Sequence, residues 1–343
     1  MIFQLSYEEL AAYMASSGEA AYRSDQVWGW LYRQSVSSFE EMTTLSLPLR
    51  RRLQADHPGS FPRLMDRAIS RDGSEKLLWQ LADGEQVESV LLQTETREGS
   101  WTSACLSTQA GCPMGCSFCA TGQAGFHRNL TAGEILAQLV GLQARSGERV
   151  GRLLLMGMGE PLLNADAVKK AIFLAQDPRG LALGGRRITL STIGPRNLGQ
   201  FLASTPRVEM AFSLHAPNDL LRASLIEQAE ALLPIRAALE LLYDYRREAG
   251  RMVTVEYLML AEINDSWSHA KELASLLEGS AFFVNLLPFN ASPGLPYHSS
   301  PAERIRAFAE VLRASGLTVK IRKPRGVDIG GACGQLRGQQ FLS

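Results

Sequence analysis

The sequence contains no long hydrophobic run and no excess of charge of either sign. Its apolar stretches, such as Phe282 to Leu287, are far shorter than the roughly 18 residues that a membrane helix needs. The segment from Met1 to Leu10 lacks the basic and apolar regions of a signal peptide. Basic and acidic residues number 35 each, so net charge gives no argument for a nucleic-acid partner, although local patches can bind one. We therefore expect a cytoplasmic protein with no membrane partner.

Internal repeats and low-complexity segments are also missing. The 343 residues are 45% hydrophobic and 20% charged, which excludes a disordered or fibrous chain. A chain of this length holds about two domains, or one large α/β domain with an appendage.

Three regions follow from the hydrophobic patterning. Residues 1–60 are expected to form a small helical domain, with helices over 7–16, 23–33 and 38–53 and with Ser24 as an N-cap. Residues 61–100 are expected to form a linker built on a β-hairpin, because alternating segments flank Asp83 and Gly84. Residues 101–343 form the third region.

This third region alternates short apolar runs with amphipathic stretches. Such alternation predicts parallel strands joined by helices, and the number of strands indicates a partial (β/α) barrel rather than a complete eight-fold one. The predicted strands cover residues 103–107, 152–158, 187–192, 208–214, 253–260, 282–288 and 317–322.

Five cysteines in a reduced protein favour metal binding or catalysis over a disulfide framework. Cys112, Cys116 and Cys119 form a C-x-x-x-C-x-x-C pattern on a glycine-containing segment. Three thiolates at this spacing can bind three irons of a cubane cluster and leave one iron without a protein ligand. A closed zinc site would need His127 or Cys105 as its fourth ligand, at spacings unlike those of zinc knuckles.

The cysteine pattern follows a predicted strand and has Phe118 immediately before its last cysteine. In both respects it resembles the radical S-adenosylmethionine (SAM) enzymes. The resemblance implies an α/β partial barrel and one [4Fe-4S] cluster, held by Cys112, Cys116 and Cys119, whose open iron chelates SAM. Reductive cleavage of SAM would then give a 5′-deoxyadenosyl radical.

Small and polar residues end several of the predicted strands. Carboxyl ends of strands build the active sites of (β/α) barrels, so we expect these residues to contact SAM, with Glu160 accepting from its ammonium group. Read alone, a Gly-Glu-Pro turn or a single His is more often structural. The expected cofactor-binding residues are Gly159, Glu160, Ser191, Ser213, Leu214, His215 and Asn290.

Two further segments narrow the resemblance. Residues 22–32 and 325–336, the latter reading RGVDIGGACGQL, are similar to the RlmN/Cfr family of RNA adenine methyltransferases, which act on carbon 2 or carbon 8 of an adenosine in 23S ribosomal RNA. The likeness runs nearly end to end. The resemblance implies 23S rRNA and also tRNA as candidate substrates, and an RNA-docking role for the helical domain of residues 1–60. It also implies two SAM molecules per turnover and an electron donor such as flavodoxin. We expect a monomer.

The resemblance assigns roles to three more residues. Ordinary methyl transfer needs a nucleophilic acceptor. Because the amidine carbon of adenine is electrophilic, ordinary methyl transfer cannot methylate it. By resemblance, Cys333 carries the methyl group, Glu88 removes the ring proton, and Cys105 releases the product by forming a disulfide with Cys333. Lys323, Arg325 and the neighbouring Arg322 would contact RNA phosphates.

Some segments depart from the family pattern. Residues 225–234 replace the usual V-P-I-N sequence, which predicts a different loop near the substrate, and Gly330 and Gly331 replace Asp-Ala. The segments 119–122 and 191–194 resemble the carbon-8 enzymes, whereas the aromatic N-terminal helix resembles the carbon-2 enzymes. We favour methylation of carbon 2, with carbon 8 as the alternative.

Two other interpretations stay open at this point. The first is a non-catalytic RNA-binding protein with a structural metal knuckle, which stoichiometric zinc in place of about four irons would indicate. The second is a radical SAM enzyme for another substrate, in which Cys333 and Cys105 would have no role.

Overall fold

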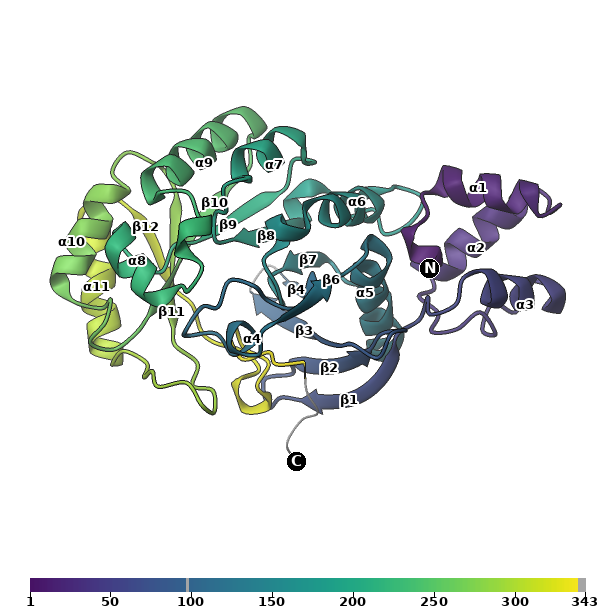
Figure 1. The fold of residues 1–343 in the computed structure, drawn as a ribbon, viewed down its shortest axis with the longest axis horizontal. Helices are drawn as coiled ribbons and strands as arrows, with labels where there is room; N and C mark the ends of the chain where they lie inside the picture. The colour runs from purple at the N-terminus through teal and green to yellow at the C-terminus, as the bar shows by residue number, and fades with distance from the viewer. Residues whose placement is uncertain (97–98, 339–343) are drawn as a thin grey trace.

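A curved mixed sheet forms the centre of the computed structural model, which describes residues 1–96 and 99–338 (Figure 1). In this part of the chain the sheet has ten strands in the order β1-β2-β3-β4-β7-β8-β9-β10-β11-β12. Neighbours from β1 to β4 are antiparallel, and all neighbours from β4 to β12 are parallel. Within the described residues β12 does not pair with β1, so the barrel is open, as the sequence predicts.

The strands match the predicted ones closely, because each parallel strand is a short apolar run between two helices. A small antiparallel pair, β5 and β6, lies beside the main sheet. The strands are β1 (Arg63–Ile69), β2 (Glu75–Gln80), β3 (Gln86–Thr96), β4 (Gly99–Cys105), β5 (Gln109–Gly111), β6 (Phe126–Asn129), β7 (Arg152–Leu155), β8 (Ile188–Thr192), β9 (Glu209–Ser213), β10 (Val253–Met259), β11 (Phe283–Pro288) and β12 (Thr318–Ile321).

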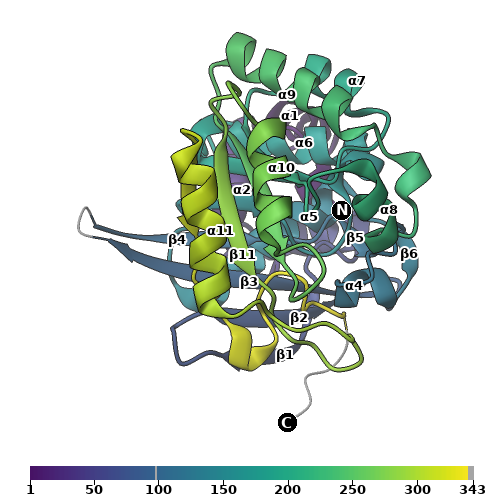
Figure 2. The ribbon, with the colours of Figure 1, turned by 90° about the vertical axis from the view of Figure 1, so that its left-hand side faces the viewer.

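Helices cover the outer face of the parallel strands, as the view along α10 and α11 shows (Figure 2). Side-chain caps start several of them, including a capping box at Thr131 and Glu134 before α5. The helices are α1 (Tyr7–Ser16), α2 (Tyr22–Tyr32), α3 (Leu47–Asp56), α4 (Ala120–Gln123), α5 (Ala132–Ser146), α6 (Ala165–Gln176), α7 (Leu198–Ser204), α8 (Asp219–Leu225), α9 (Ile235–Ala249), α10 (Trp267–Leu276) and α11 (Ala302–Ala314). Short 3₁₀ turns are η1 (Ile2–Gln4), η2 (Pro161–Asn164), η3 (Gly185–Arg187), η4 (Ala229–Ala231) and η5 (Val327–Ile329).

The N-terminal helices α1 to α3 lie to one side of the sheet (Figure 1). They share the main hydrophobic core, to which they contribute buried side chains such as Met14, Trp28 and Leu53. The N–H of Ile2 donates to the Ser60 hydroxyl at 2.8 Å, which ties the start of the chain to the end of this helical part.

Two helix predictions in this part are wrong. The segment predicted as a helix over 38–53 is helical only from Leu47, because the Ser46 hydroxyl caps a new helix and residues 38–46 form turns. The predicted N-cap Ser24 lies inside α2, buried and with no hydrogen-bond partner for its hydroxyl among the described residues, and the chain enters the helix at Ala21.

The hairpin predicted around Asp83 and Gly84 is confirmed as β2 and β3. It continues the main sheet through β4 instead of standing apart, and β1 adds a further antiparallel strand. No helix in the described part of the chain is long and apolar enough to cross a membrane.

Candidate active site

The three clustered cysteines lie on a loop between β5 and α4, which we call the cysteine loop (residues 112–119). Gly111 precedes this loop at φ +77°, where a Cβ would clash with the Gly125 carbonyl oxygen, so only glycine fits. Cys119 ends it as the residue before α4. A small apolar cluster that includes Met114, Phe118 and Ile226 packs around the loop.

The donor set of this loop fits an iron–sulfur cluster. Burial and the neighbouring thiols raise the pKa of Cys112 to about 12 and the pKa of Cys116 well above its usual value. These thiols therefore ionise together only when metal cations bind them. In the described residues no three His, Cys, Asp or Glu side chains converge on one point as they would around a single ion. A cubane takes each thiolate on a different iron, which this spacing allows, whereas the predicted zinc knuckle needs convergence.

Segment 225–234, which departs from the family pattern, packs against the cysteine loop. Ile226 forms a β-bridge with Cys116, and the Ser117 N–H donates to the Leu225 carbonyl at 3.0 Å. The Glu227 side chain lies so close to Gly115 that a Cβ there would meet it at 2.5 Å. Segment 225–234 therefore supports the cysteine loop.

Glu160 follows Gly159 at the end of the segment after β7 and is tied to β8. Its carboxylate accepts from the Thr192 hydroxyl at 2.8 Å and the Ile193 N–H at 2.9 Å. Burial raises the pKa of Glu160 to about 7 against these hydrogen bonds. Gly159 has φ +103° and contacts Gln109, which accepts from the Glu160 N–H at 2.8 Å. These bonds fix the carboxylate beside Cys112.

Ser191 and Ser213 end the adjacent strands β8 and β9, and their hydroxyl oxygens lie 3.0 Å apart. Leu214 is buried, and its N–H donates to the Glu256 carbonyl at 3.0 Å. The structure therefore brings these three predicted residues together at one end of the sheet. Asn290 follows β11, and its amide donates to the Cys333 carbonyl at 3.3 Å.

His215 is buried in a strained conformation with φ +60°. Its Nδ1 accepts from the Leu258 N–H at 3.1 Å, and the buried Asn264 donates to its carbonyl at 2.8 Å. Burial lowers the pKa of His215 to about 3, so the ring is neutral at physiological pH. Its bonds hold the end of β9 against β10.

Arg222 is a buried cation that the sequence does not reveal, because it reads as an exposed position of the short helix α8. Its guanidinium donates to the carbonyls of Ile193 and Ser213, while Nε and Nη1 have no partner among the described residues. It lies close enough to Cys116 and Glu160 to affect their pKa values. Arg222 therefore offsets negative charge beside the cysteine loop.

A second group of predicted residues lies on β3 and β4. Glu88 is buried, and its carboxylate accepts from Lys76 Nζ at 3.2 Å and from the Arg337 N–H at 2.9 Å. Burial raises the pKa of Glu88, opposed by Lys76. Cys105 is partly buried and pairs with Val90 across β3 and β4. The sequence context of Glu88 alone favours an exposed strand carboxylate, but the structure buries it.

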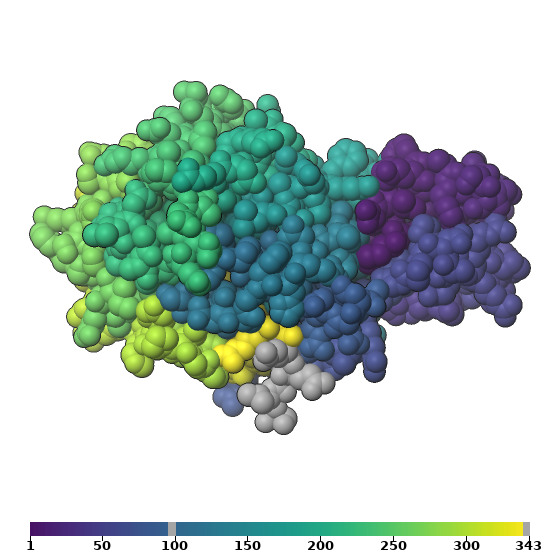
Figure 3. All heavy atoms as spheres, viewed as in Figure 1, coloured from purple at the N-terminus to yellow at the C-terminus, as the bar shows by residue number. Residues whose placement is uncertain are grey.

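Cys333 lies in the C-terminal segment (residues 326–338), which crosses between the two groups (Figure 1). The Ala120 N–H donates to the Gly334 carbonyl at 2.8 Å, immediately after the last residue of the cysteine loop, and the Arg337 N–H reaches Glu88. Cys333 itself is exposed. In the space-filling view this segment, in yellow, emerges between the green and blue parts of the surface (Figure 3).

Cys105 and Cys333 are close enough to affect each other. Burial, together with the Cys333 thiol, raises the pKa of Cys105 to about 12, and Arg322 opposes this. All five cysteines are free thiols in the structure. Arg322 is partly buried, lines a cavity with Glu256 and Asn285, and lies close to Cys105 and Cys333. Lys323 is exposed.

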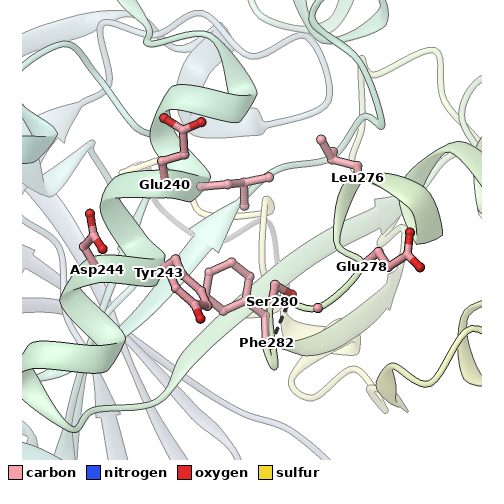
Figure 4. A pocket seen from close by; sticks show the side chains of 9 residues that line it. Glu240, Tyr243, Asp244, Leu276, Glu278, Ser280 and Phe282 are labelled. Carbon is pink, nitrogen blue, oxygen red and sulfur yellow. Dashed lines mark hydrogen bonds between the residues drawn. The ribbon is translucent and has the colours of Figure 1, made fainter.

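Another pocket lies between α9 and α10 (Figure 4). Tyr243 and Phe282 line it together with the carboxylates of Glu240, Asp244 and Glu278, and none of the predicted site residues does. Its negative charge would repel RNA phosphates.

Comparisons with known proteins show the family of the chain. Residues 2–57 match the family described as ribosomal RNA large subunit methyltransferase N-terminal domain, and residues 106–274 match the radical SAM superfamily. A probable dual-specificity RNA methyltransferase RlmN from Thermotoga neapolitana is 40% identical over 100% of this chain and 98% of its own length. The dual-specificity RNA methyltransferase RlmN from Solidesulfovibrio magneticus is 43% identical over 98% of this chain and 96% of its own.

A solved structure shares the whole fold. The crystal structure of a radical SAM methyltransferase from Sphaerobacter thermophilus superposes with a TM-score of 0.92 at 38% identity, covering 98% of this chain and 99% of that one. Membership of the radical SAM superfamily implies a [4Fe-4S] cluster and SAM. With full-length relatives at this identity, the chain belongs to the RlmN family of radical SAM RNA methyltransferases.

Proposed function

We propose that this enzyme methylates carbon 2 of an adenosine in 23S ribosomal RNA, and in tRNA as a second substrate, through an S-methylcysteine on Cys333. One observation carries the proposal. The segment that holds Cys333 is bonded on one side to α4, directly after the cysteine loop, and on the other side to the carboxylate of Glu88. The words "dual-specificity" in the names of the relatives support more than one RNA substrate.

The cysteine loop would hold the cluster through Cys112, Cys116 and Cys119, and the neighbouring strand ends would hold SAM. When bound, the cluster and SAM supply a carbon radical that takes one hydrogen atom from a methyl group. Arg222 and Glu160 are buried, and their hydrogen bonds to the protein fix both charged groups in a place that excludes water.

Cys333 is suited to carry the methyl group because it is exposed on a segment that is bonded on both sides. Its thiolate attacks the methyl group of a first SAM, so that an S–CH₃ bond forms, the bond from the methyl group to the SAM sulfur breaks, and a neutral thioether leaves. Loss of one hydrogen atom from this methyl group leaves a radical on the carbon bonded to the Cys333 sulfur. This carbon radical adds to the adenine carbon.

Glu88 and Cys105 complete the reaction. After addition, the ring would pass one electron back to the cluster that supplied it, and Glu88 would take the ring proton, as a buried carboxylate with a raised pKa can do. The Cys105 thiolate then attacks the Cys333 sulfur, so that an S–S bond forms and the S–CH₂ bond breaks. The carbon keeps the electron pair and takes up a proton to become the product methyl group.

The test is mass spectrometry of nucleosides from 23S rRNA and tRNA after incubation with the cluster-loaded enzyme, SAM and a reductant. The proposal expects 2-methyladenosine. Finding 8-methyladenosine would overturn the choice of ring carbon. A fully loaded enzyme that cleaves SAM and leaves both RNAs without methylated adenosine would overturn the proposed function.

A further inference from the structure

Lys76 is a buried lysine that no part of the proposed reaction uses. It lies on β2 opposite Val90 of β3, and Val90 lies opposite Cys105 of β4. Directly opposed residues of antiparallel strands share a face of the sheet, and residues two positions apart on one strand do so too. Lys76, Glu88 and Cys105 therefore lie on one face.

The Lys76 ammonium group makes contacts on both sides of this face. It lies 3.2 Å from Glu88 Oε1, and the exposed fractions of the two side chains are 7% and 1%. It also donates to the Gly330 carbonyl at 3.3 Å, three residues before Cys333. A single cation thus joins the proposed ring base to the segment that carries the methyl group.

The part of the C-terminal segment that Lys76 contacts is anchored to the turn between β1 and β2. The Gly326 N–H donates to Asp72 at 2.8 Å, and the Ser70 hydroxyl donates to Asp328 at 2.5 Å. Gly330 is consequently fixed relative to β2, so its carbonyl is a stable partner for the ammonium group.

In the part of the chain that the structure describes, the groups that face Glu88 include the Lys76 ammonium from β2 and the backbone N–H groups of Arg337 and Gly338 from the C-terminal segment. The Cys105 thiol lies on the same face of β4. The Arg337 guanidinium is directed elsewhere, to Ser292 and Pro293. Burial favours the protonated carboxyl, and Lys76 supplies the charge that opposes it.

We propose that Lys76 is a positioning residue for the methyl transfer: it holds Glu88 as a carboxylate and fixes it relative to the segment that carries Cys333. This inference rests on the proposed role of Glu88 as the ring base. A buried carboxylate that loses its cation takes up a proton at a higher pH than before, and a protonated Glu88 cannot accept the ring proton.

The experiment compares cluster-loaded wild type with K76Q, K76R, E88Q and the double variant K76Q/E88Q. The control is R67Q, which removes a more exposed cation–carboxylate pair of 2.7 Å, between Arg67 of β1 and Glu75 of β2 in the same sheet. For each protein, RNA methylation is measured between pH 6 and 9, and methylation of Cys333 is measured separately by peptide mass spectrometry. Full Cys333 methylation shows that the variant is folded and loaded.

We expect K76Q to move the rising limb of the pH profile upward by about one unit or more, the size of shift that a close opposite charge causes. Its rate would then fall about tenfold along the rising limb and recover at high pH. K76R and R67Q should keep the wild-type profile, and K76Q/E88Q should be no slower than E88Q. A K76Q profile that coincides with wild type would overturn the inference while E88Q remains impaired.

If E88Q itself turns over like wild type, the proposed base is wrong, and this result is distinct from a failure of Lys76 alone. A second measurement covers the case that K76Q does not fold. Infrared difference spectra of wild type against E88Q report the protonation of Glu88 in the intact enzyme. Ionised Glu88 at pH 7 is expected, and a protonated carboxyl band at that pH would contradict the charge role of Lys76.

Discussion

The side-chain amide of Asn290 donates a hydrogen bond to the backbone carbonyl of Cys333 at 3.3 Å. The sequence suggests that Asn290 contacts the cofactor, whereas this bond directs its donor to the segment that carries Cys333. A second bond, from Gln335 to the Ala291 carbonyl at 2.7 Å, joins the same two segments. The loop after β11 is therefore a support for Cys333.

We expect the change Asn290→Ala to slow methylation of Cys333 about fivefold, because a lost hydrogen bond of about 1 kcal/mol loosens the segment. SAM affinity should stay within about twofold of wild type. Peptide mass spectrometry gives the first quantity and equilibrium dialysis the second. Weakened SAM binding with normal Cys333 methylation would show that Asn290 contacts the cofactor instead.

Replacing Cys105 by Ala should trap the enzyme on its RNA. Addition to the ring and proton loss do not need the Cys105 thiol, so a Cys333–methylene–adenine link should accumulate and be visible as RNA-linked protein on a denaturing gel. The double change Cys105→Ala with Cys333→Ala should abolish it, because the attachment point is gone. Normal turnover of Cys105→Ala would refute the release role.

Release of the product should speed up as the pH rises. Burial raises the pKa of Cys105 to about 12, so at neutral pH almost all of it is the unreactive thiol. Once the Cys333 sulfur is a thioether, it no longer adds to this shift, but burial does. The thiolate fraction then grows about tenfold per pH unit. In single-turnover experiments, decay of the RNA-linked protein should follow this slope between pH 7 and 8.5, and a pH-independent decay would contradict it.

His215→Ala should destabilise the fold by about 1–3 kcal/mol at pH 7, since the buried Leu258 N–H loses its acceptor. The pKa of His215 is about 3 in the folded protein, below that of an unfolded His, so its contribution is present above pH 6.5 and is lost as pH falls. The deficit of the variant should therefore shrink by about 2 kcal/mol between pH 7 and 5. Urea unfolding measures this, with exposed His298→Ala as a control expected within about 0.5 kcal/mol of wild type.

The parallel half of the fold could be predicted from sequence because each strand is a short apolar run between amphipathic helices. β8, for example, is found at Ile188–Thr192 against the predicted 187–192. The structure of the segment before α3 could not be predicted. Phe39, Met42 and Leu45 recur every three residues, as apolar residues do in a helix, but here turns bury them against the core. Periodicity does not distinguish these two cases.

The site could be predicted where its residues form local motifs, as in the cysteine loop. The contacts of the site between residues far apart in the sequence could not be predicted. Lys76 reads as a polar strand position, and it is buried only because Gly330, 254 residues later, lies over it. Arg222 and Arg322 are similar cases, because cations in short amphipathic elements are usually solvated and only the packed structure reveals their neighbours.

The central claim is that the methyl group passes through Cys333. The most direct test loads Cys333 with a CD₃ group, removes the labelled SAM, and then supplies unlabelled SAM, reductant and RNA for one turnover. Because one deuterium is taken as an atom and the last hydrogen comes from solvent, the account predicts 2-methyladenosine with two deuteriums in its methyl group. An unlabelled methyl group, or one with all three deuteriums, would contradict transfer through a Cys333 methylene.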